Sequence, residues 1–323
     1  MPTPVPTRPA HPERWFRTRP DSSVLTRPRL LARSLIHATD LDDHIAFYEH
    51  LLHVDADLRM PIPDFGGLEL AAVGNLLLIA SERPFTPVQR RTAYSLIVPS
   101  LTAQLTLLHT TATTVLEAPE PILPGARARV RYPDGQLAEL VEHRPYHGEQ
   151  PRTRPRTDNA THDNATHGNN GNDSGSSSSD GDGDGDGGRA GGEGGGCAAR
   201  DGAPRLLVRR AVPEEEFTTT LRLYEHLLQA PALAAPAPAG PRPAHAALIG
   251  DLLLVARTTP DPAPCPTALV LPATPPPTTP ATGTGTADGT GARAGYGESA
   301  DGNTVLLAGG VRAELWHSPR PPH

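Results

Sequence analysis

The stretch "FYEHLL" at residues 47–52 returns as "LYEHLL" at residues 223–228, an offset of 176 positions. At the same offset, "GNLLLIA" (74–80) lies over "GDLLLVA" (250–256). Two matches at one constant offset indicate that a longer unit than a single peptide is repeated in the chain.

The match continues to the end of each half. "LAELVEH" (137–143) lies over "RAELWH" (312–317) at an offset of 175. An offset that stays nearly constant over this length is typical of a duplicated domain. We therefore expect two copies, residues 28–145 and 203–319.

Composition separates the copies from the rest of the chain. The 323 residues include 38 prolines and 31 glycines, and most of the glycines lie between the two matching regions or in an insert within the second. Such segments bury too little apolar surface to fold, and we expect them to be disordered. They are the N-terminal segment 1–27, a Gly/Ser/Asp/Asn linker at 146–202 and a low-complexity insert at about 272–302 in the second copy, which makes that copy degenerate.

Hydrophobic periodicity predicts two similar modules in each copy. "RSLIHA" (33–38) alternates as a strand, and Asp40 is placed to cap the helix that follows. The predicted elements after this helix are the strands "LELAAV" (68–73), "NLLLIA" (75–80) and "AYSLIV" (93–98), a helix from Pro99-Ser100, and the strands "TTVLEA" (113–118), "ARARVRY" (126–132) and "LAELVEH" (137–143). The fold class is therefore α+β, and each copy is expected to bury one sheet face and to leave a cup on the other.

The repeated pentapeptide lies on the first helix of each copy. Tyr48 and Tyr224 fall on its apolar stripe, so we expect them to pack in the core with the hydroxyl at the edge. His50 and His226 fall on the opposite side and should face solvent. The pentapeptide would thus be repeated because it holds the helix against the sheet.

Two longer motifs carry a resemblance to a known family. "DLDDHIAFYEHLL" (40–52), followed about eighty residues later by "YPDGQLAELVEH" (132–143), resembles the glyoxalase/bleomycin-resistance/extradiol-dioxygenase group, the vicinal oxygen chelate superfamily. The resemblance implies two tandem glyoxalase-like domains, each of paired βαβββ modules that form a cup-shaped mixed sheet. It says little of activity, because isomerases, dioxygenases, thiol transferases and drug-sequestering proteins share this scaffold.

The resemblance also implies where a metal would bind. Metal enzymes of the group take ligands from the first and last strand of each module. Those positions fall at Arg33, near Leu78, at Ala93 and at Glu139 in the first copy, and near Leu207, Leu254 and Thr267 and at Glu314 in the second. Only the two glutamates are metal-ligand types, whereas a catalytic ion ordinarily needs about three. We therefore expect no metal cofactor; a divalent ion on the non-standard ligands His37 and Glu139, joined by His44 or His109, is the alternative.

Charge and composition exclude several classes of partner. The net charge is −7 and no basic footprint is clustered, which argues against nucleic acid. Cys197 and Cys265 give neither a disulfide framework nor a paired thiolate site. No apolar run reaches membrane-spanning length and no secretory signal is present, so a soluble, cytoplasmic protein is expected.

Together these patterns predict a protein that binds a small organic molecule in the cup of the first copy, without a catalytic metal. The expected polar contacts are Arg33, His37 and Glu139, and the expected apolar walls are Leu35, Phe65 and Leu137. Two alternatives stay open: a metal-dependent lyase or extradiol-type dioxygenase with non-standard ligands, and a non-catalytic scaffold. The copies could pair within one chain as a pseudo-dimer, or the chain could form a homodimer.

Overall fold

The computed structural model describes residues 15–17, 21–62, 67–122, 125–145, 203–239, 243–258, 266–272, 297–298 and 304–317. The elements of the first copy are β1 (Trp15–Phe16), β2 (Arg29–His37), α1 (Leu41–Leu52), β3 (Ala56–Ile62), β4 (Leu68–Val73), β5 (Leu76–Ser81), α2 (Pro87–Arg91), β6 (Thr92–Ile97), α3 (Leu101–Leu108), β7 (Thr114–Ile122), β8 (Gly125–Arg131) and β9 (Leu137–Glu142). Those of the second copy are β10 (Arg205–Pro213), α4 (Phe217–Leu228), β11 (Ala232–Ala234), β12 (Ala237–Pro238), β13 (Ala246–Ile249), β14 (Leu252–Arg257), β15 (Thr267–Leu271), β16 (Gly297–Glu298), β17 (Thr304–Leu306) and β18 (Arg312–His317).

The strands of the first copy form one mixed sheet in the order β1-β3-β4-β5-β2-β6-β9-β8-β7. Strands β2 and β5 are parallel, as are β6 and β9, because a helix or a longer connection lies between the members of each pair. The two modules meet where β2 and β6 pair antiparallel. This is the predicted α+β fold of paired βαβββ modules.

The second copy repeats the arrangement in the order β11-β13-β14-β10-β15-β18-β17-β16, and β12 pairs with β18. Its modules likewise meet at an antiparallel pair, β10 and β15. The region of the predicted low-complexity insert lies largely outside the described residues, as does the whole 146–202 linker. Among the described helices of both copies, none is long and apolar enough to cross a lipid bilayer.

The first copy and the segment before it differ from the prediction in three respects. Part of the segment 1–27 is ordered, because β1 pairs with β3 and Ser22 donates a hydrogen bond to the His143 carbonyl from its backbone N–H (3.1 Å). Strand β3 and helix α2 were not predicted from periodicity. Asp40 makes no side-chain cap of α1; it lies in a short 3-10 turn, and its carboxylate accepts a hydrogen bond from the Thr39 hydroxyl (2.9 Å).

The first sheet has two differently filled faces, which strand alternation separates. One face packs against α1 through Ile45, Tyr48 and their neighbours on β4 and β5. The opposite, inner face carries a separate apolar cluster of Leu31, Ala72, Leu77, Ile79, Ile97 and Val141. The cup is therefore bounded by the residues of β2, β5, β6 and β9 that point away from the helix.

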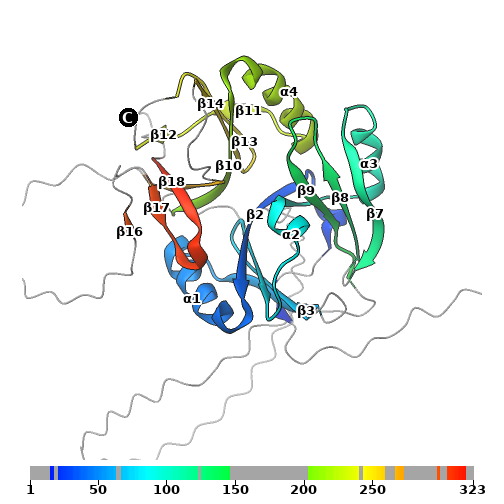
Figure 1. The fold of residues 1–323 in the computed structure, drawn as a ribbon, viewed down its shortest axis with the longest axis vertical. Helices are drawn as coiled ribbons and strands as arrows, with labels where there is room; N and C mark the ends of the chain where they lie inside the picture. The colour runs from blue at the N-terminus through cyan, green and yellow to red at the C-terminus, as the bar shows by residue number, and fades with distance from the viewer. Residues whose placement is uncertain are drawn as a thin grey trace, which may run out of the picture.

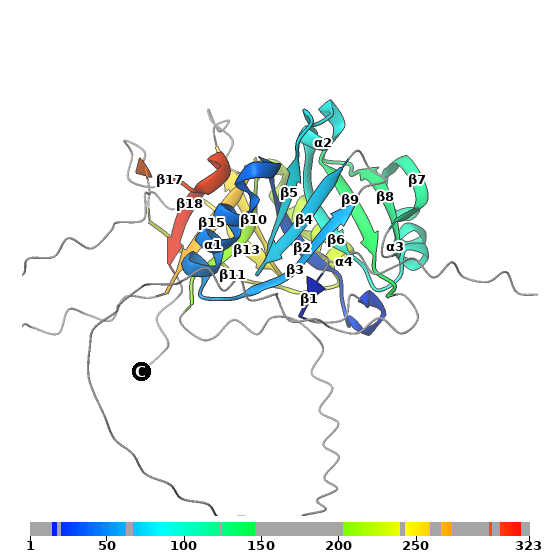
Figure 2. The same ribbon diagram turned by 90° about the horizontal axis from the view of Figure 1, so that it is seen from below.

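The two copies lie side by side in both views, with α1 against the end of the second sheet and α4 against the first (Figures 1 and 2). Their helix-side faces share one apolar cluster, which includes Tyr48 and Tyr224. The Tyr48 hydroxyl donates to the Ala308 carbonyl (2.8 Å), and the Tyr224 hydroxyl donates to an Asp134 carboxylate oxygen (2.9 Å). Each repeated tyrosine thus holds its own helix on the sheet, as predicted, and also binds a tight turn of the other copy.

Removing the Tyr48 hydroxyl tests this contact. Tyr48→Phe should lower the free energy of unfolding by about 1–2 kcal/mol, because the Ala308 carbonyl loses its donor at the interface between the copies. Urea unfolding followed by circular dichroism measures the change. His50→Gln, on the exposed side of the same helix, should stay within about 0.5 kcal/mol of wild type. Equal stability of Tyr48→Phe and wild type would contradict the bridging role.

Candidate functional site: the cup of the first copy

The inner face of the first sheet encloses a cavity of about 790 Å³. Its side walls are mostly aliphatic. They come from alternate positions of the strands and from the ordered N-terminal segment, and they include Leu25, Leu31, Leu58, Met60, Ile62, Leu68, Leu70, Ala72, Leu77, Ile79, Ile97, Ile122 and Val141. This volume lies in the range of small-molecule pockets, which are usually apolar with a few placed polar groups.

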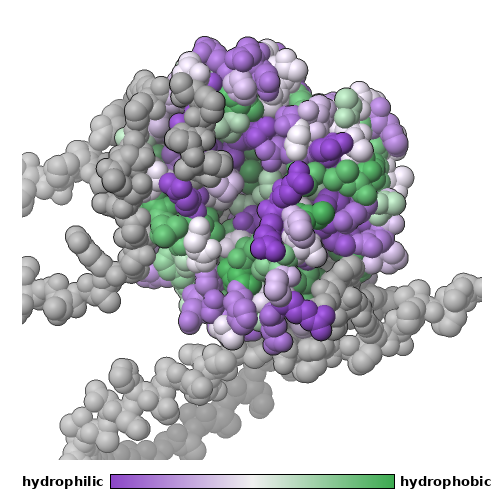
Figure 3. Space-filling model, in the orientation of Figure 1, coloured by the Kyte–Doolittle hydropathy of each residue, from purple (hydrophilic) through white to green (hydrophobic). Residues whose placement is uncertain are grey.

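The rim of the cavity is partly polar. Thr86 and Gln89 line it, and they belong to the capping box that starts α2. Figure 3 shows hydrophilic side chains gathered over α2 on the face in view. The cavity thus combines an aliphatic interior with a polar edge.

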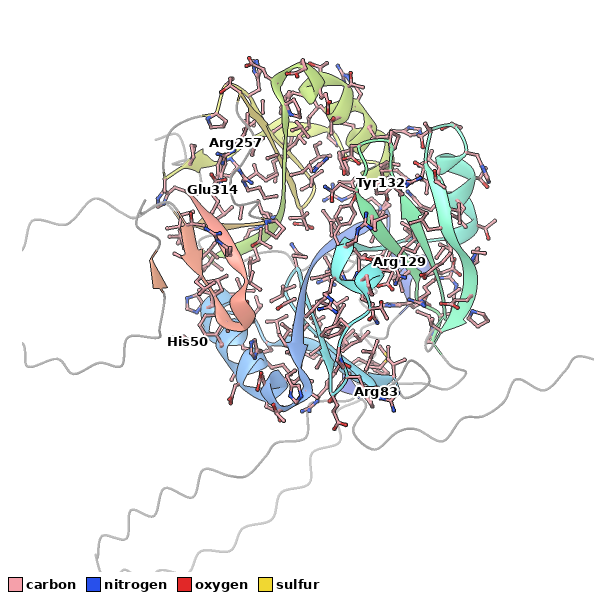
Figure 4. The ribbon with its side chains drawn as sticks, viewed as in Figure 1. His50, Arg83, Arg129, Tyr132, Arg257 and Glu314 are labelled. Carbon is pink, nitrogen blue, oxygen red and sulfur yellow. The ribbon has the colours of Figure 1, made fainter. Side chains whose placement is uncertain are left out.

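Glu139 on β9 is the centre of a polar cluster inside the cavity. One of its carboxylate oxygens accepts hydrogen bonds from Arg127 (3.0 Å) and Arg129 (3.4 Å), and the other accepts from the Ser95 hydroxyl (3.1 Å). The sheet register causes this convergence, because Glu139 pairs with Ser95 on β6 and with Arg129 on β8. Figure 4 labels Arg129 within the first sheet.

The two arginines also bind carboxylates on β7. Arg129 pairs with Glu117, and Arg127 pairs with Glu120 and, at 3.7 Å, with Glu117. The Arg129 side chain is 5 % exposed, whereas Glu117 and Glu120 are 38 % and 43 % exposed. The network therefore runs from the protein interior at Glu139 to the solvent side of the β7–β8 hairpin.

The surroundings of Glu139 keep it ionised. Burial acts to raise the pKa of its carboxyl, but the charges of Arg33, Arg129 and Arg127 outweigh burial and hold the pKa below its ordinary value. For Arg33, burial is the largest effect and lowers the pKa of the guanidinium, against the opposing charge of Glu139. A buried carboxylate is thus compensated by its arginine neighbours.

The structure brings together two of the residues predicted for the site. Arg33 and Glu139 line the same cavity. Leu35 packs beside the inner-face cluster and Leu137 is buried, but neither lines the cavity. Phe65 lies outside the described residues.

The structure places His37 apart from this cavity. His37 follows the alternation of β2, but it lies at the exposed end of the strand and does not line the cavity. Its Nδ1 accepts a hydrogen bond from the Thr39 backbone N–H (3.3 Å), which caps the following turn. Of the other histidines, Nδ1 of His44 contacts the Asp40 carbonyl at 2.6 Å, and His109 is exposed after α3. These histidines therefore do not gather around Glu139.

Two positions predicted for metal ligands in the first copy, near Leu78 and at Ala93, lie one or two residues from the corresponding positions in the structure. Leu78 points to the helix side, and its neighbours Leu77 and Ile79 face the cup. An irregularity in the pairing of β6 with β9 displaces Ala93, so Ser95 takes the place beside Glu139. A one-residue shift turns a side chain to the other face of a strand, which accounts for these errors.

In the second copy, the residues at these positions are Arg209, Leu253 and Ala268, each within two residues of the predicted Leu207, Leu254 and Thr267. The first-strand position is therefore arginine in both copies, Arg33 and Arg209. Arg127 and Arg129 were missed, although the period-two repeat of arginine in "ARARVRY" signals a polar strand face.

The divalent metal typical of the resembled family does not fit these residues. Among the described residues, no group of three or more His, Cys, Asp or Glu side chains is placed to hold a metal ion. At the four strand positions of the first copy, the structure puts Arg33, Leu77, Ser95 and Glu139. Both oxygens of Glu139 already accept hydrogen bonds from Ser95 and the two arginines, so this carboxylate is engaged within the protein.

The second copy carries a larger side chain at a matching position of its inner face. Trp316 is 1 % exposed and occupies the β18 position that matches Val141 on β9. Glu314, the counterpart of Glu139, pairs with Arg209 and Arg257 (2.7 Å) and accepts a hydrogen bond from the Trp316 indole (3.1 Å). Figure 4 shows Glu314 and Arg257 close together in the second sheet.

No family model matches the chain, and no curated protein matches it. An uncharacterized protein from Methanosarcina mazei is 32 % identical over 36 % of this chain and 92 % of that chain, with a TM-score of 0.33.

Two solved structures match most of the chain at low identity. The Mn(II)-bound glyoxalase from Novosphingobium aromaticivorans is 12 % identical over 91 % of this chain and 82 % of that chain (TM-score 0.41). The 2,3-dioxygenase LapB from Pseudomonas sp. KL28 is 13 % identical over 93 % and 95 % (TM-score 0.40). The fold itself is read from the strand order and pairing of this chain, two βαβββ modules per copy that meet at an antiparallel strand pair. On that topology, the chain has the fold of the vicinal oxygen chelate superfamily, in two tandem copies.

Proposed function

We propose that the first copy binds a small organic molecule in its cup, without a catalytic metal. The observation that carries this proposal is the 790 Å³ cavity, with aliphatic walls and an ionic cluster at Glu139. Its size suits a small organic ligand, and its few polar groups could fix the orientation of that ligand.

The second copy supports the proposal by contrast. Both copies share the sheet, the first-strand arginine and the closing glutamate, yet the second copy carries the buried Trp316 where the first has Val141, which lines the cavity. The fold thus accommodates a buried tryptophan at this position, so the smaller valine of the first copy is not required by the sheet. A cavity kept open usually costs stability, which favours a binding role for the first copy.

The substitution Val141→Trp tests the proposal, because it gives the first copy the tryptophan that the second copy carries at the matching position, Trp316. Wild-type protein should show a saturable rise in melting temperature with compounds from a small-molecule library. At a ligand concentration of about 100 times Kd, the stabilisation should be about 2.7 kcal/mol. Val141→Trp should remain folded, because the indole has a cavity to occupy, and should lose the ligand-dependent rise.

The control is Leu306→Trp, which adds the same side chain at a position 48 % exposed on the second copy. It should respond to ligand as wild type does. A library of aromatic, aliphatic, charged and neutral compounds without one saturable hit on wild type would refute binding in the cup.

A further inference from the structure

Arg33 differs from the other arginines of the cavity, because none of the described carboxylates lies within ion-pair distance of it. Its Nη1 donates one long hydrogen bond, 3.5 Å, to the Thr92 carbonyl. Its Nε is buried and has no hydrogen-bond partner in the described part of the chain. A buried guanidinium with open donors is costly unless something pairs with it.

The remaining charges that line the cavity are engaged with one another. Arg127 and Arg129 bind Glu139 and Glu117, as described above. At the mouth, Arg29 pairs with Asp57 (3.3 Å) and donates to the Gly74 carbonyl (2.5 Å). Nε of Arg129 is likewise buried without a partner in the described part of the chain, but the other nitrogens of that guanidinium bind Glu117 and Glu139. An incoming anion would therefore find at Arg33 a guanidinium that no described carboxylate already binds.

The charge pattern also argues against a cationic ligand. A cation would need a carboxylate, but both oxygens of Glu139 already accept hydrogen bonds from Arg127, Arg129 and Ser95. The same cation would be repelled by Arg33. A single guanidinium outside ion-pair distance of the described carboxylates fits a single negative charge, and its planar fork matches a carboxylate in particular.

The apolar walls define the rest of the ligand. Leu31 precedes Arg33 by two positions on β2, and Leu77, paired with Arg33 across the sheet, also lines the cavity. A carboxylate bound at Arg33 would thus have its attached carbon skeleton against aliphatic side chains. Burial of that skeleton would supply the nonspecific part of the affinity.

We infer that the ligand of the first cup is a small organic monocarboxylate with an apolar body, whose carboxylate pairs with Arg33. This inference rests on the proposed function and adds to it the chemical class of the ligand. Arg33 would be the residue that selects an anion over a neutral compound of the same shape.

Matched pairs of compounds test the charge of the ligand. The probes are octanoate with octanamide, and 2-naphthoate with 2-naphthamide, titrated into the full-length wild-type chain by calorimetry and by melting temperature. At least one carboxylate should bind at least about tenfold more tightly than its amide, since a charge-assisted hydrogen bond is replaced by a neutral one. Equal or tighter binding of the amides would overturn the inference.

The substitution Arg33→Met tests whether Arg33 pairs with the carboxylate of the ligand. It should weaken the preferred carboxylate at least about tenfold and leave its amide unchanged. Because no described carboxylate pairs with Arg33, the free variant should melt no lower than wild type. Arg222→Met is the control, since Arg222 is 75 % exposed on α4, and it should bind both compounds as wild type does. Unchanged carboxylate affinity in Arg33→Met would refute the assignment.

The outcomes separate the two proposals. Binding of neutral compounds without a preference for carboxylates would overturn the anion inference and leave ligand binding in place. No binding by any of the four probes or by the library would overturn both. If Arg33→Met fails to fold, the wild-type pairs and Arg33→Lys, which keeps the charge but not the fork, still decide the result.

Discussion

Replacing Glu139 with glutamine is expected to lower the free energy of unfolding by about 3–5 kcal/mol, the usual effect of breaking a buried ion pair. The Glu139 side chain is 13 % exposed and is hydrogen-bonded to Arg127 and Arg129. The neutral amide would leave the positive charges of these arginines and of Arg33 facing one another. Urea unfolding at pH 7 measures the loss.

The loss of stability in Glu139→Gln should become smaller as the pH falls. The folded-state pKa of Glu139 lies below the ordinary value of 4.5, so the stability from its ionisation is complete at pH 7 and is lost as pH falls through the folded pKa. The difference in stability between wild type and Glu139→Gln should therefore shrink below about pH 4.5. A difference that stays constant down to pH 3 would show that the charge of Glu139 is not what stabilises the fold.

Glu120→Gln provides the matched control. Glu120 pairs with the same Arg127, but its side chain is 43 % exposed, so its ion pair is screened by solvent. Its loss should cost less than about 1 kcal/mol. A loss as large as that of Glu139→Gln would mean that burial does not set the strength of this network.

The second large effect is expected from Trp316→Ala, at about 3–5 kcal/mol. The indole is 1 % exposed in an apolar cluster with Leu207, Leu253 and Val270, and it donates to Glu314. Truncation removes the packing, leaves a cavity and takes away a donor from a partly buried carboxylate. Circular dichroism in urea measures the change, because the variant lacks this fluorophore.

The cavity left by Trp316→Ala should also be detectable directly. Benzene should raise the melting temperature of the variant and not that of Trp316→Phe, which refills most of the space. Loss of less than about 1 kcal/mol, with no response to benzene, would contradict the view that Trp316 packs in the apolar cluster of the second sheet.

The site was only partly predictable. The strand that carries a residue follows from local sequence, whereas the neighbours of that residue depend on the pairing of strands far apart in the chain. That Arg33 and Glu139 lie on a first and a last strand follows from local patterns and from the spacing of the motifs. That Ser95 takes the place expected for Ala93 depends on an irregularity between β6 and β9, which no local pattern marks. A shift of one residue changes the face, so small register errors misplaced most of the predicted ligand positions.

The sequence by itself determined the duplication, the order of most helices and strands of the first copy, and the replacement of metal-ligand types at the strand positions. These properties depend on residue type and on periods of two and 3.6, which are local.

Only the tertiary structure decided three further points: that Arg127 and Arg129 converge on Glu139, that each repeated tyrosine binds the opposite copy, and that Trp316 is buried in the apolar cluster of the second sheet. All three join residues far apart in the chain, and strand register and packing between the copies bring them together. The physical reason is that local preference fixes which face a side chain takes on its own strand, whereas its partners are fixed by the neighbouring strands and by the other copy.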